Sequence, residues 1–267
     1  MKQKINKLFK IKYLYTGLIC IGIIIISVIF IITYFNNTTE NYSNISLPIN
    51  FLSKYETQKF ISDDSDDYIK NLTIYDLRAR KVNSNNEYID LITDNCINFS
   101  EEEKDKLGFC AKQAKSFFDN GFTWTFALIK DIYEEGFPHT RSNIIFLAPN
   151  ILKYNNEELI KTLIHESVHI YQRYNSDKMA EYIKNNGYSI FKKKEKKSLI
   201  RSNPDLDEYI YKDKNGIEMV AKYKSEYPIG INDTLLSNSS NEHPFEKMAY
   251  EIAENYYKSV LTKYKDI

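Results

Sequence analysis

The sequence predicts an α+β domain, mostly helical with a small sheet, preceded by one transmembrane helix. Three observations support this. Several segments of the 267-residue chain repeat apolar residues every three or four positions, as amphipathic helices do. Two short segments are apolar or alternate, as strands do. Near the start, 20 consecutive residues carry no charge. The length suffices for one large domain with a hydrophobic core.

The uncharged run extends from Thr16 to Phe35 and predicts a transmembrane signal anchor. As a helix it would be about 30 Å long, the thickness of a bilayer core. A cleavable signal peptide is the alternative, but its apolar region is usually about 7–15 residues and ends in small residues. Five lysines and no acid precede the run, so residues 1–15 are expected in the cytosol. The body is then extracytosolic, in an endomembrane lumen, at the cell surface or on a virion membrane.

Residues 36–50 are polar and predict a linker, and residues 51–267 form the expected folded domain. After the first 34 residues the chain holds 31 basic and 36 acidic side chains, a net charge of −5. A mildly acidic body without a long basic stripe argues against a nucleic-acid partner. The basic run from Lys192 to Lys197 is interpreted as a solvated loop.

Helices are expected over residues 68–81, 87–93, 101–118, 156–173 and 178–185, and from Pro244 to about residue 261. Strands are expected over residues 123–130 and 143–147, paired in one small sheet. Asn215-Gly216 predicts a two-residue hairpin turn between residues 209–212 and 217–223.

Cys96 and Cys110 are the two cysteines of the expected extracytosolic body. A disulfide between them is narrowly favoured over two buried thiols, and it would stabilise the fold by about 3 kcal/mol. Sequence spacing says nothing about the Cα separation, so both possibilities remain open.

The strongest chemical signal is His165-Glu166-Ser167-Val168-His169, within an expected helix. Residues four apart project from the same side of a helix, so both imidazoles can reach one metal ion. Glu166 follows the first histidine and can contact water at the metal instead of the metal itself. This is the zincin arrangement, with Zn²⁺ held by two His ligands and the glutamate acting as general base. The alternative is a surface helix with two incidental histidines.

A catalytic zinc site needs a third protein ligand and an open position for water. The residues after His169 lack the glycine and the later histidine of the extended motif, so this ligand must come from elsewhere. Glu246 on the C-terminal helix is the predicted ligand. His243 is the alternative, and Glu251 a weaker one.

Four segments together resemble a family of zinc metallopeptidases of large nucleocytoplasmic DNA viruses and protists. These are FPHTRSNIIFL, TLIHESVHIYQR, RSNPDLDEYIY and NEHPFEKMAYEIA, and the resemblance as a whole extends over roughly residues 77–253. The resemblance implies a zincin-like domain with zinc but no particular substrate. Glu246 with Ala249 also resembles the glutamate helix of the gluzincin class, in which a small residue lets that helix pack against the metal helix. Tyr250 lies on the Glu246 face and is assigned a catalytic role with it.

His139 comes just before the strand over residues 143–147, and in zincins the strand leading into the metal helix lines the cleft and can pair with an extended peptide. His139 is therefore expected to contact substrate or polarise a carbonyl, with a histidine that closes a turn as the alternative. Residues 203–207 favour a structural turn over a partner of a zinc-bound histidine. Residues 171–173 are expected to pack and pair structurally at the end of the metal helix.

These features predict a membrane-anchored zinc metallohydrolase, a peptidase that acts on protein or peptide substrates with Glu166 as general base. The alternative function is a non-catalytic membrane or virion protein with a structural zinc site. The sequence does not predict the oligomeric state.

Overall fold

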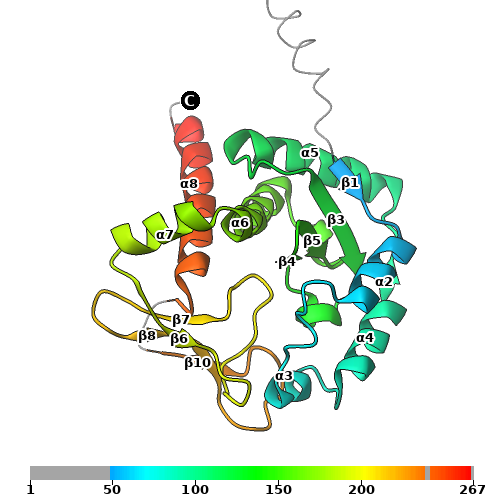
Figure 1. Ribbon diagram of the computed structural model, residues 1–267. Coiled ribbons are helices and arrows are strands. Elements are labelled where there is room, and N and C mark those ends of the chain that lie inside the picture. Colours follow the sequence, from blue (N-terminus) through cyan, green and yellow to red (C-terminus); the bar gives the residue numbers. More distant parts are fainter. Residues whose placement is uncertain (1–48, 238–240, 266–267) are drawn as a thin grey trace, which may run out of the picture. The chain divides into compact units, whose positions relative to one another are not determined.

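The computed structural model describes residues 49–237 and 241–265, which belong to one compact unit beginning at Pro48 (Figure 1). Its α-helices are α2 (Lys54–Asp63), α3 (Ile74–Ala79), α4 (Asn85–Asp94), α5 (Glu101–Phe117), α6 (Asn156–Tyr174), α7 (Ser176–Asn185) and α8 (Pro244–Lys265). Its strands are β1 (Ile49–Phe51), β2 (Cys96–Ile97), β3 (Trp124–Ile129), β4 (His139–Arg141), β5 (Ile144–Leu147), β6 (Ser189–Lys193), β7 (Tyr209–Lys212), β8 (Glu218–Met219), β9 (Ala221–Tyr223) and β10 (Thr234–Leu236). The predicted mixture of helices and strands is confirmed.

The main sheet has the strand order β1-β3-β5-β4, and β2 also pairs with β3. Strands β1, β3 and β5 are parallel, and β4 runs antiparallel to β5. The predicted pairing of residues 123–130 with residues 143–147 is confirmed, with Phe126 opposite Ile145. Residues 144–147 do not form the edge of the sheet, however. The short strand β4 covers them, so His139 itself belongs to the edge strand.

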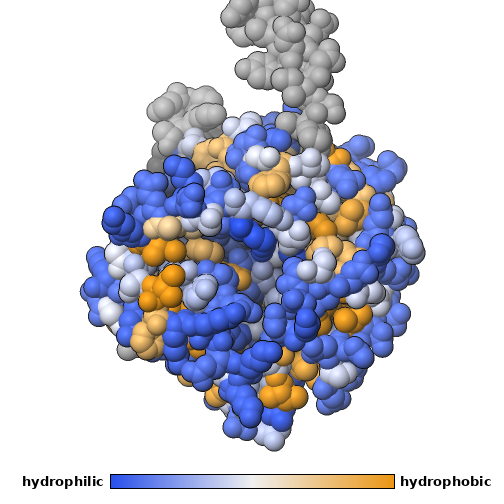
Figure 2. Space-filling model, in the orientation of Figure 1, coloured by the Kyte–Doolittle hydropathy of each residue, from blue (hydrophilic) through white to orange (hydrophobic). Residues whose placement is uncertain are grey.

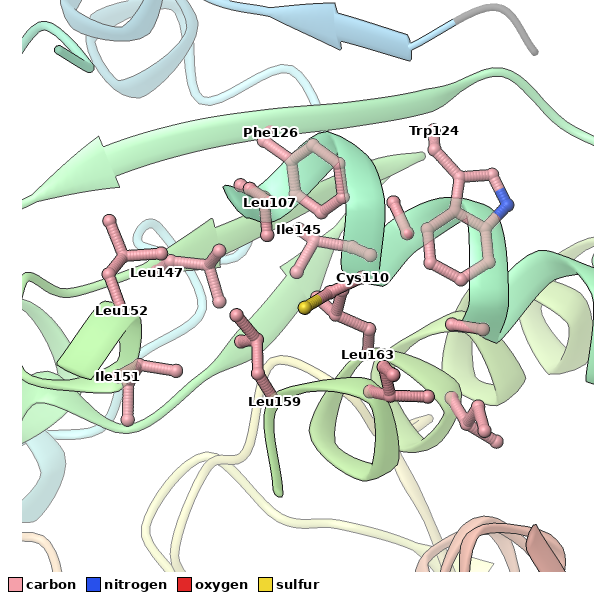
Figure 3. Packing of buried hydrophobic residues seen from close by; sticks show 14 of the residues in the cluster. Leu107, Cys110, Trp124, Phe126, Ile145, Leu147, Ile151, Leu152, Leu159 and Leu163 are labelled. Atoms are coloured by element: carbon pink, nitrogen blue, oxygen red, sulfur yellow. The ribbon is translucent and has the colours of Figure 1, made fainter. Parts of the chain in front are cut away.

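Helices cover both faces of this sheet because β3 alternates between two cores. Trp124, Phe126 and Leu128 pack with α5 and α6, as Figure 3 shows for the first two. Ala127 and Ile129 pack on the opposite face with residues of α2, α3 and α4. A strand exposes successive side chains to opposite faces, so a strand buried along its whole length reads as an apolar run.

The helices begin at capping residues that the sequence supplies. The Ser100 side chain accepts a hydrogen bond from the backbone N–H of Glu103, and the Glu103 carboxylate accepts one from the backbone N–H of Ser100. This confirms the predicted capping box. The prediction of one helix over residues 68–81 is wrong, because only Ile74–Ala79 is helical. Asp64 and Asp67 have φ of 41° and 56°, and Asp64 binds the backbone N–H groups of Ile69 and Lys70. These aspartates make a turn where the pattern suggested helix.

Cys96 and Cys110 are both buried and unpaired, which corrects the narrow preference for a disulfide. Cys96 packs among the residues on the α2–α4 side of the sheet, whereas Cys110 packs on the α5–α6 side. The sheet therefore lies between the two thiols.

Two smaller sheets follow, with the orders β6-β7-β8 and β9-β10. The predicted hairpin forms, but its turn has three residues instead of two. The N–H of Asp213 binds the carbonyl of Ile217, and Gly216 has φ of 76° in the loop between them. Apolar side chains gather on the surface beside α7 and the β6–β7 pair (Figure 2). They line a groove of about 760 Å³ that includes Met179, Ile183 and Ile190.

Within residues 49–237 and 241–265, no helix is long and apolar enough to cross a membrane. The predicted cytosolic segment 1–15, the transmembrane segment 16–35 and nearly all of the predicted linker 36–50 lie outside the described residues.

Candidate metal centre

Helix α6 carries both histidines of the predicted site. Asn155 caps it by accepting a hydrogen bond from the N–H of Glu158, and Glu157 and Glu158 lie at its positive N-terminus. Leu159 and Leu163 are buried against the sheet and α5. The predicted helix over residues 156–173 is confirmed.

The structure brings His165, His169 and Glu246 together as a group that could hold a metal ion. The Nε2 atoms of the two histidines lie 3.1 Å apart, and Oε2 of Glu246 lies 3.4 Å from Nε2 of His165 and 3.8 Å from Nε2 of His169. Ligand atoms about 2.0–2.1 Å from one tetrahedral ion would be about 3.3 Å apart, so the spacing fits a shared ion. Predicted ligands from α6 and α8 therefore converge, although His169 and Glu246 lie 77 positions apart in the sequence.

Two amides orient these ligands. Oε1 of Gln172 lies 2.9 Å from Nδ1 of His169, and the Gln172 amide donates to the carbonyl of Phe245 on α8. Because the Gln172 oxygen can only accept, the His169 ring carries its proton on Nδ1. The lone pair of Nε2 is then available on the side of Glu246. Asn203 donates to Oε1 of Glu246 at 3.0 Å, so Oε2 faces the histidines.

These two orienting contacts were not among the sequence expectations. The sequence predicts only structural packing and pairing for Gln172, without naming His169 as its partner, although a position three residues after His169 on the same helix is a usable signal. Residues 203–207 were considered as partners of a zinc-bound histidine. In the structure, the residue of this segment that orients a ligand is Asn203, and the ligand it binds is Glu246 instead of a histidine.

The charge states in the structure suit a cation. Burial alone would raise the pKa of Glu246, but His169, His165 and Asn203 outweigh it and hold the pKa at about 2. Burial lowers the pKa of His169 despite the opposing charges of Asp205 and Glu246, so this imidazole gives up its proton more readily than an exposed one. Two imidazoles and one carboxylate are the donor set of many catalytic zinc sites.

Glu166 lies beside this group without joining it. Its side chain is buried, and Oε2 has no hydrogen-bond partner among the described residues. Burial, with the nearby charges of Asp205 and Glu246, raises the pKa of Glu166 well above its usual range. A buried carboxylate oxygen without a partner is costly and therefore indicates a functional group.

A cavity of about 590 Å³ opens at this group and is lined by His165, Glu166 and Glu246. Tyr250 and His139 also line it. Five of the six predicted site residues therefore reach the cavity, and the sixth, His169, is fully buried. The Tyr250 ring lies 4.6 Å from the His165 ring, centre to centre, and the side chain is exposed. The catalytic roles of Tyr250 and His139 stay predictions.

His243 lies outside the metal group. Its Nε2 is 3.3 Å from Oδ1 of Asp207, and its Nδ1 accepts the N–H of Phe245. Glu251, the weaker alternative, forms an ion pair with Lys247 on the same helix. The structure thus groups Glu246 with the two histidines and leaves both alternatives with other partners.

Comparisons with protein-family models, with curated proteins and with solved structures give no match.

Proposed function

We propose that this protein is a zinc-dependent metallohydrolase of zincin-like fold, and that it acts as a peptidase. One observation carries the proposal. Two histidines converge with Glu246 beside an open cavity, and the same cavity is lined by Glu166, whose buried carboxylate has an unpartnered oxygen. The resemblance to the viral and protist zinc metallopeptidases supports the same reading, as does a metal helix that directly follows a mixed sheet with an antiparallel edge strand.

His165, His169 and Glu246 would hold the zinc, which supplies Lewis-acid chemistry by acidifying water and polarising a carbonyl. Glu166 accepts the proton of the attacking water and passes it to the leaving nitrogen. Burial raises the pKa of Glu166, which is the direction expected for a carboxylate that carries a proton to the leaving group. Tyr250 supplies an O–H donor for the substrate oxygen from beside His165.

A structural zinc site is the rival function. Structural sites usually close around the ion with four protein ligands, whereas catalytic sites keep one position open. Within residues 49–237 and 241–265, the group comprises three ligand residues and borders a cavity, which favours catalysis.

Elemental analysis and cleavage profiling test the proposal together. We expect one zinc per chain in the wild type and in Glu166→Gln, and nearly none in His165→Ala. Zinc-dependent cuts in a proteome-derived peptide library should appear with the wild type alone. Equal, near-zero zinc in all three would refute the metal site, and identical cleavage profiles for wild type and Glu166→Gln would refute the hydrolase.

We further propose that residues 16–35 anchor the protein in a membrane, with residues 1–15 cytosolic and the body extracytosolic. The uncharged run and the five lysines before it support this. Protease added outside intact microsomes should leave the body undigested. Digestion of the body under those conditions would refute the orientation.

A further inference from the structure

A left-handed turn of the backbone directly precedes residues that line the metal cavity. Glu134, Glu135 and Gly136 have φ of 44°, 53° and 77°, a region that favours glycine, although two of the three are glutamates. The next residues, Phe137 and Pro138, line the cavity. Strained backbone of this kind persists only where surrounding contacts hold it, and it often occurs at functional sites.

The two glutamates of this turn have different partners. Glu134 is buried and pairs with Arg80 in the core. Glu135 is exposed, and its Oε1 accepts a hydrogen bond from the backbone N–H of Ile231 at 3.0 Å. Its Oε2 accepts one from the side-chain amide of Asn232 at 3.4 Å. The core contact of Glu134 thus holds the turn, and the turn places the Glu135 carboxylate against the other two residues.

Gly230 allows the close approach of this carboxylate. A Cβ at residue 230 would overlap Oε1 of Glu135, and the three heavy atoms nearest to it all belong to the Glu135 side chain. The φ of Gly230 lies outside the left-handed region, so alanine would meet no backbone strain there. The contact with Glu135, and not the backbone conformation, therefore explains the glycine.

Glu135 binds the start of a wall segment, residues 231–236. The residues of this segment that line the metal cavity are Ile231, Asn232, Thr234 and Leu236. Leu236 is 54% exposed, as is Phe137 after the turn, so both side chains can contact a ligand in the cavity. Because the metal group lines the same cavity, a peptide that fills it lies against the wall segment.

A second contact holds the same loop away from the cavity. Nη1 of Arg78 donates to the carbonyl of Glu226 at 2.8 Å, and its guanidinium lies 4.4 Å from the centre of the Tyr227 ring. None of these three residues lines the metal cavity. Loss of the Arg78 contact would therefore loosen the loop without removing the contact at the wall segment.

We propose that Glu135 is a positioning residue, which holds the wall segment in place to bind the substrate chain. This inference rests on the proposed peptidase function and assigns a substrate-binding wall to it. Glu135 neither belongs to the metal group nor lines the cavity, so it acts through the wall segment. Loss of its bond to Ile231 should weaken substrate binding and leave the chemical step nearly unchanged.

Hydrogen exchange of the full-length, zinc-loaded protein tests the contact itself. The amide of Ile231 should exchange at least tenfold faster in Glu135→Ala than in the wild type, because its acceptor is lost. Glu135→Gln keeps an Oε1 acceptor, and Arg78→Ala keeps the Glu135 contact, so both should stay within threefold of the wild type. Unchanged exchange in Glu135→Ala, or an equal increase in Arg78→Ala, would overturn the proposal.

Steady-state kinetics test the consequence for the substrate. The probe is a fluorescence-quenched peptide with the sequence that the wild type cuts fastest in the peptide library. Glu135→Ala should raise KM at least fivefold, with kcat within twofold of the wild type and unchanged zinc content. Glu135→Gln and Arg78→Ala should keep KM within twofold. An unchanged KM in Glu135→Ala, or an equal rise in Arg78→Ala, would overturn the proposal.

Gly230→Ala tests the same contact from the other side. The added methyl group should displace the Glu135 carboxylate and raise KM as Glu135→Ala does. In the double variant the methyl group has no carboxylate to displace, so KM should equal that of Glu135→Ala alone. Gly108→Ala, whose Cβ enters open space, should keep the KM of the wild type. Increases that multiply in the double variant would overturn the proposal.

The two measurements separate this inference from the proposed function. No cleavage of the library by the wild type would refute the peptidase and the substrate-binding role of the wall segment with it. Hydrogen exchange would still decide whether Glu135 holds that segment. Cleavage by the wild type with an unchanged KM in Glu135→Ala would leave the peptidase standing and overturn the role of Glu135.

Discussion

At the scale of single residues, the decisive choice is between Glu246 and His243 as the third ligand. The two lie three positions apart at the start of α8, and both side chains are buried. Only Glu246 approaches both histidines, whereas His243 faces Asp207. Helical phase explains the difference, because Pro244 begins the helix and Glu246 lies within its first turn.

We therefore expect Glu246→Ala to lose most bound zinc and all activity, because two histidines alone do not complete the site. His243→Ala should keep the zinc and lose activity only partly. Zinc per chain, measured after dialysis, checks this with both variants prepared in parallel. The reverse pattern would transfer the ligand role to His243.

Gln172 connects one ligand to the helix that supplies another. It accepts from His169 and donates to the carbonyl of Phe245, the residue just before Glu246. Gln172→Ala should weaken zinc binding about 10–100-fold, as is typical when the partner of a metal-bound histidine is lost. Competition with a chelator measures the affinity, and the exposed Gln113→Ala on α5 is the control. An unchanged affinity would show that packing alone orients His169.

At the scale of elements, the sequence predicted those with a clear period. Helices α5 and α6 and strands β3 and β5 appear where apolar patterns and caps placed them. The pattern failed at residues 68–73, where the backbone N–H groups of Ile69 and Lys70 donate to the Asp64 carboxylate and the chain makes a turn instead of a helix. It also failed for the two thiols, because only the sheet pairing shows that they lie on opposite faces.

The packing of α8 on α6 fixes the distance between the ligands. Ala249 is fully buried, one turn after Glu246, as expected for a small residue between two close helices. Ala249→Leu would insert three carbons there. We expect it to destabilise the protein by about 1–3 kcal/mol and to weaken zinc binding, since α8 must move. Chemical unfolding of the metal-free protein measures the first effect.

The control for Ala249→Leu is Asn255→Leu, at an exposed position of the same helix. It adds similar apolar volume without entering the interface, so its stability and zinc binding should stay near wild type. Equal effects of the two variants would contradict close packing at Ala249.

At the scale of the whole molecule, ion pairs of two buried arginines connect segments that lie far apart in the sequence. Glu134 pairs with Arg80 and accepts a hydrogen bond from Tyr88, and all three are buried. Arg141 on the edge strand pairs with Asp64 and Asp66 after α2. No local pattern predicts such pairs, because each joins residues more than 50 positions apart.

These pairs predict a loss of stability in acid. Burial alone would raise the pKa of Glu134, but Arg80 outweighs it and holds the pKa below its usual value. Arg141 does the same for Asp66. A carboxyl group with a lower pKa in the folded state stabilises the fold above its unfolded pKa, about 4, and the stabilisation is lost as the pH falls through the folded pKa. The urea midpoint of the metal-free protein should therefore be steady near pH 7 and fall below about pH 5.

Glu134→Gln tests the origin of this acid sensitivity. It removes the nearer carboxylate of buried Arg80 and leaves Asp76, 3.9 Å away, as the remaining counter-charge, so it should destabilise the protein by about 3 kcal/mol at pH 7. The loss should shrink as the pH falls, because protonation of Glu134 then weakens the same pair in the wild type. Glu101→Gln, at an exposed helix start with a surface pair to Lys104, should change stability by about 0–1 kcal/mol. A Glu134→Gln loss that stays constant from pH 7 to pH 3 would assign the acid sensitivity to other carboxylates.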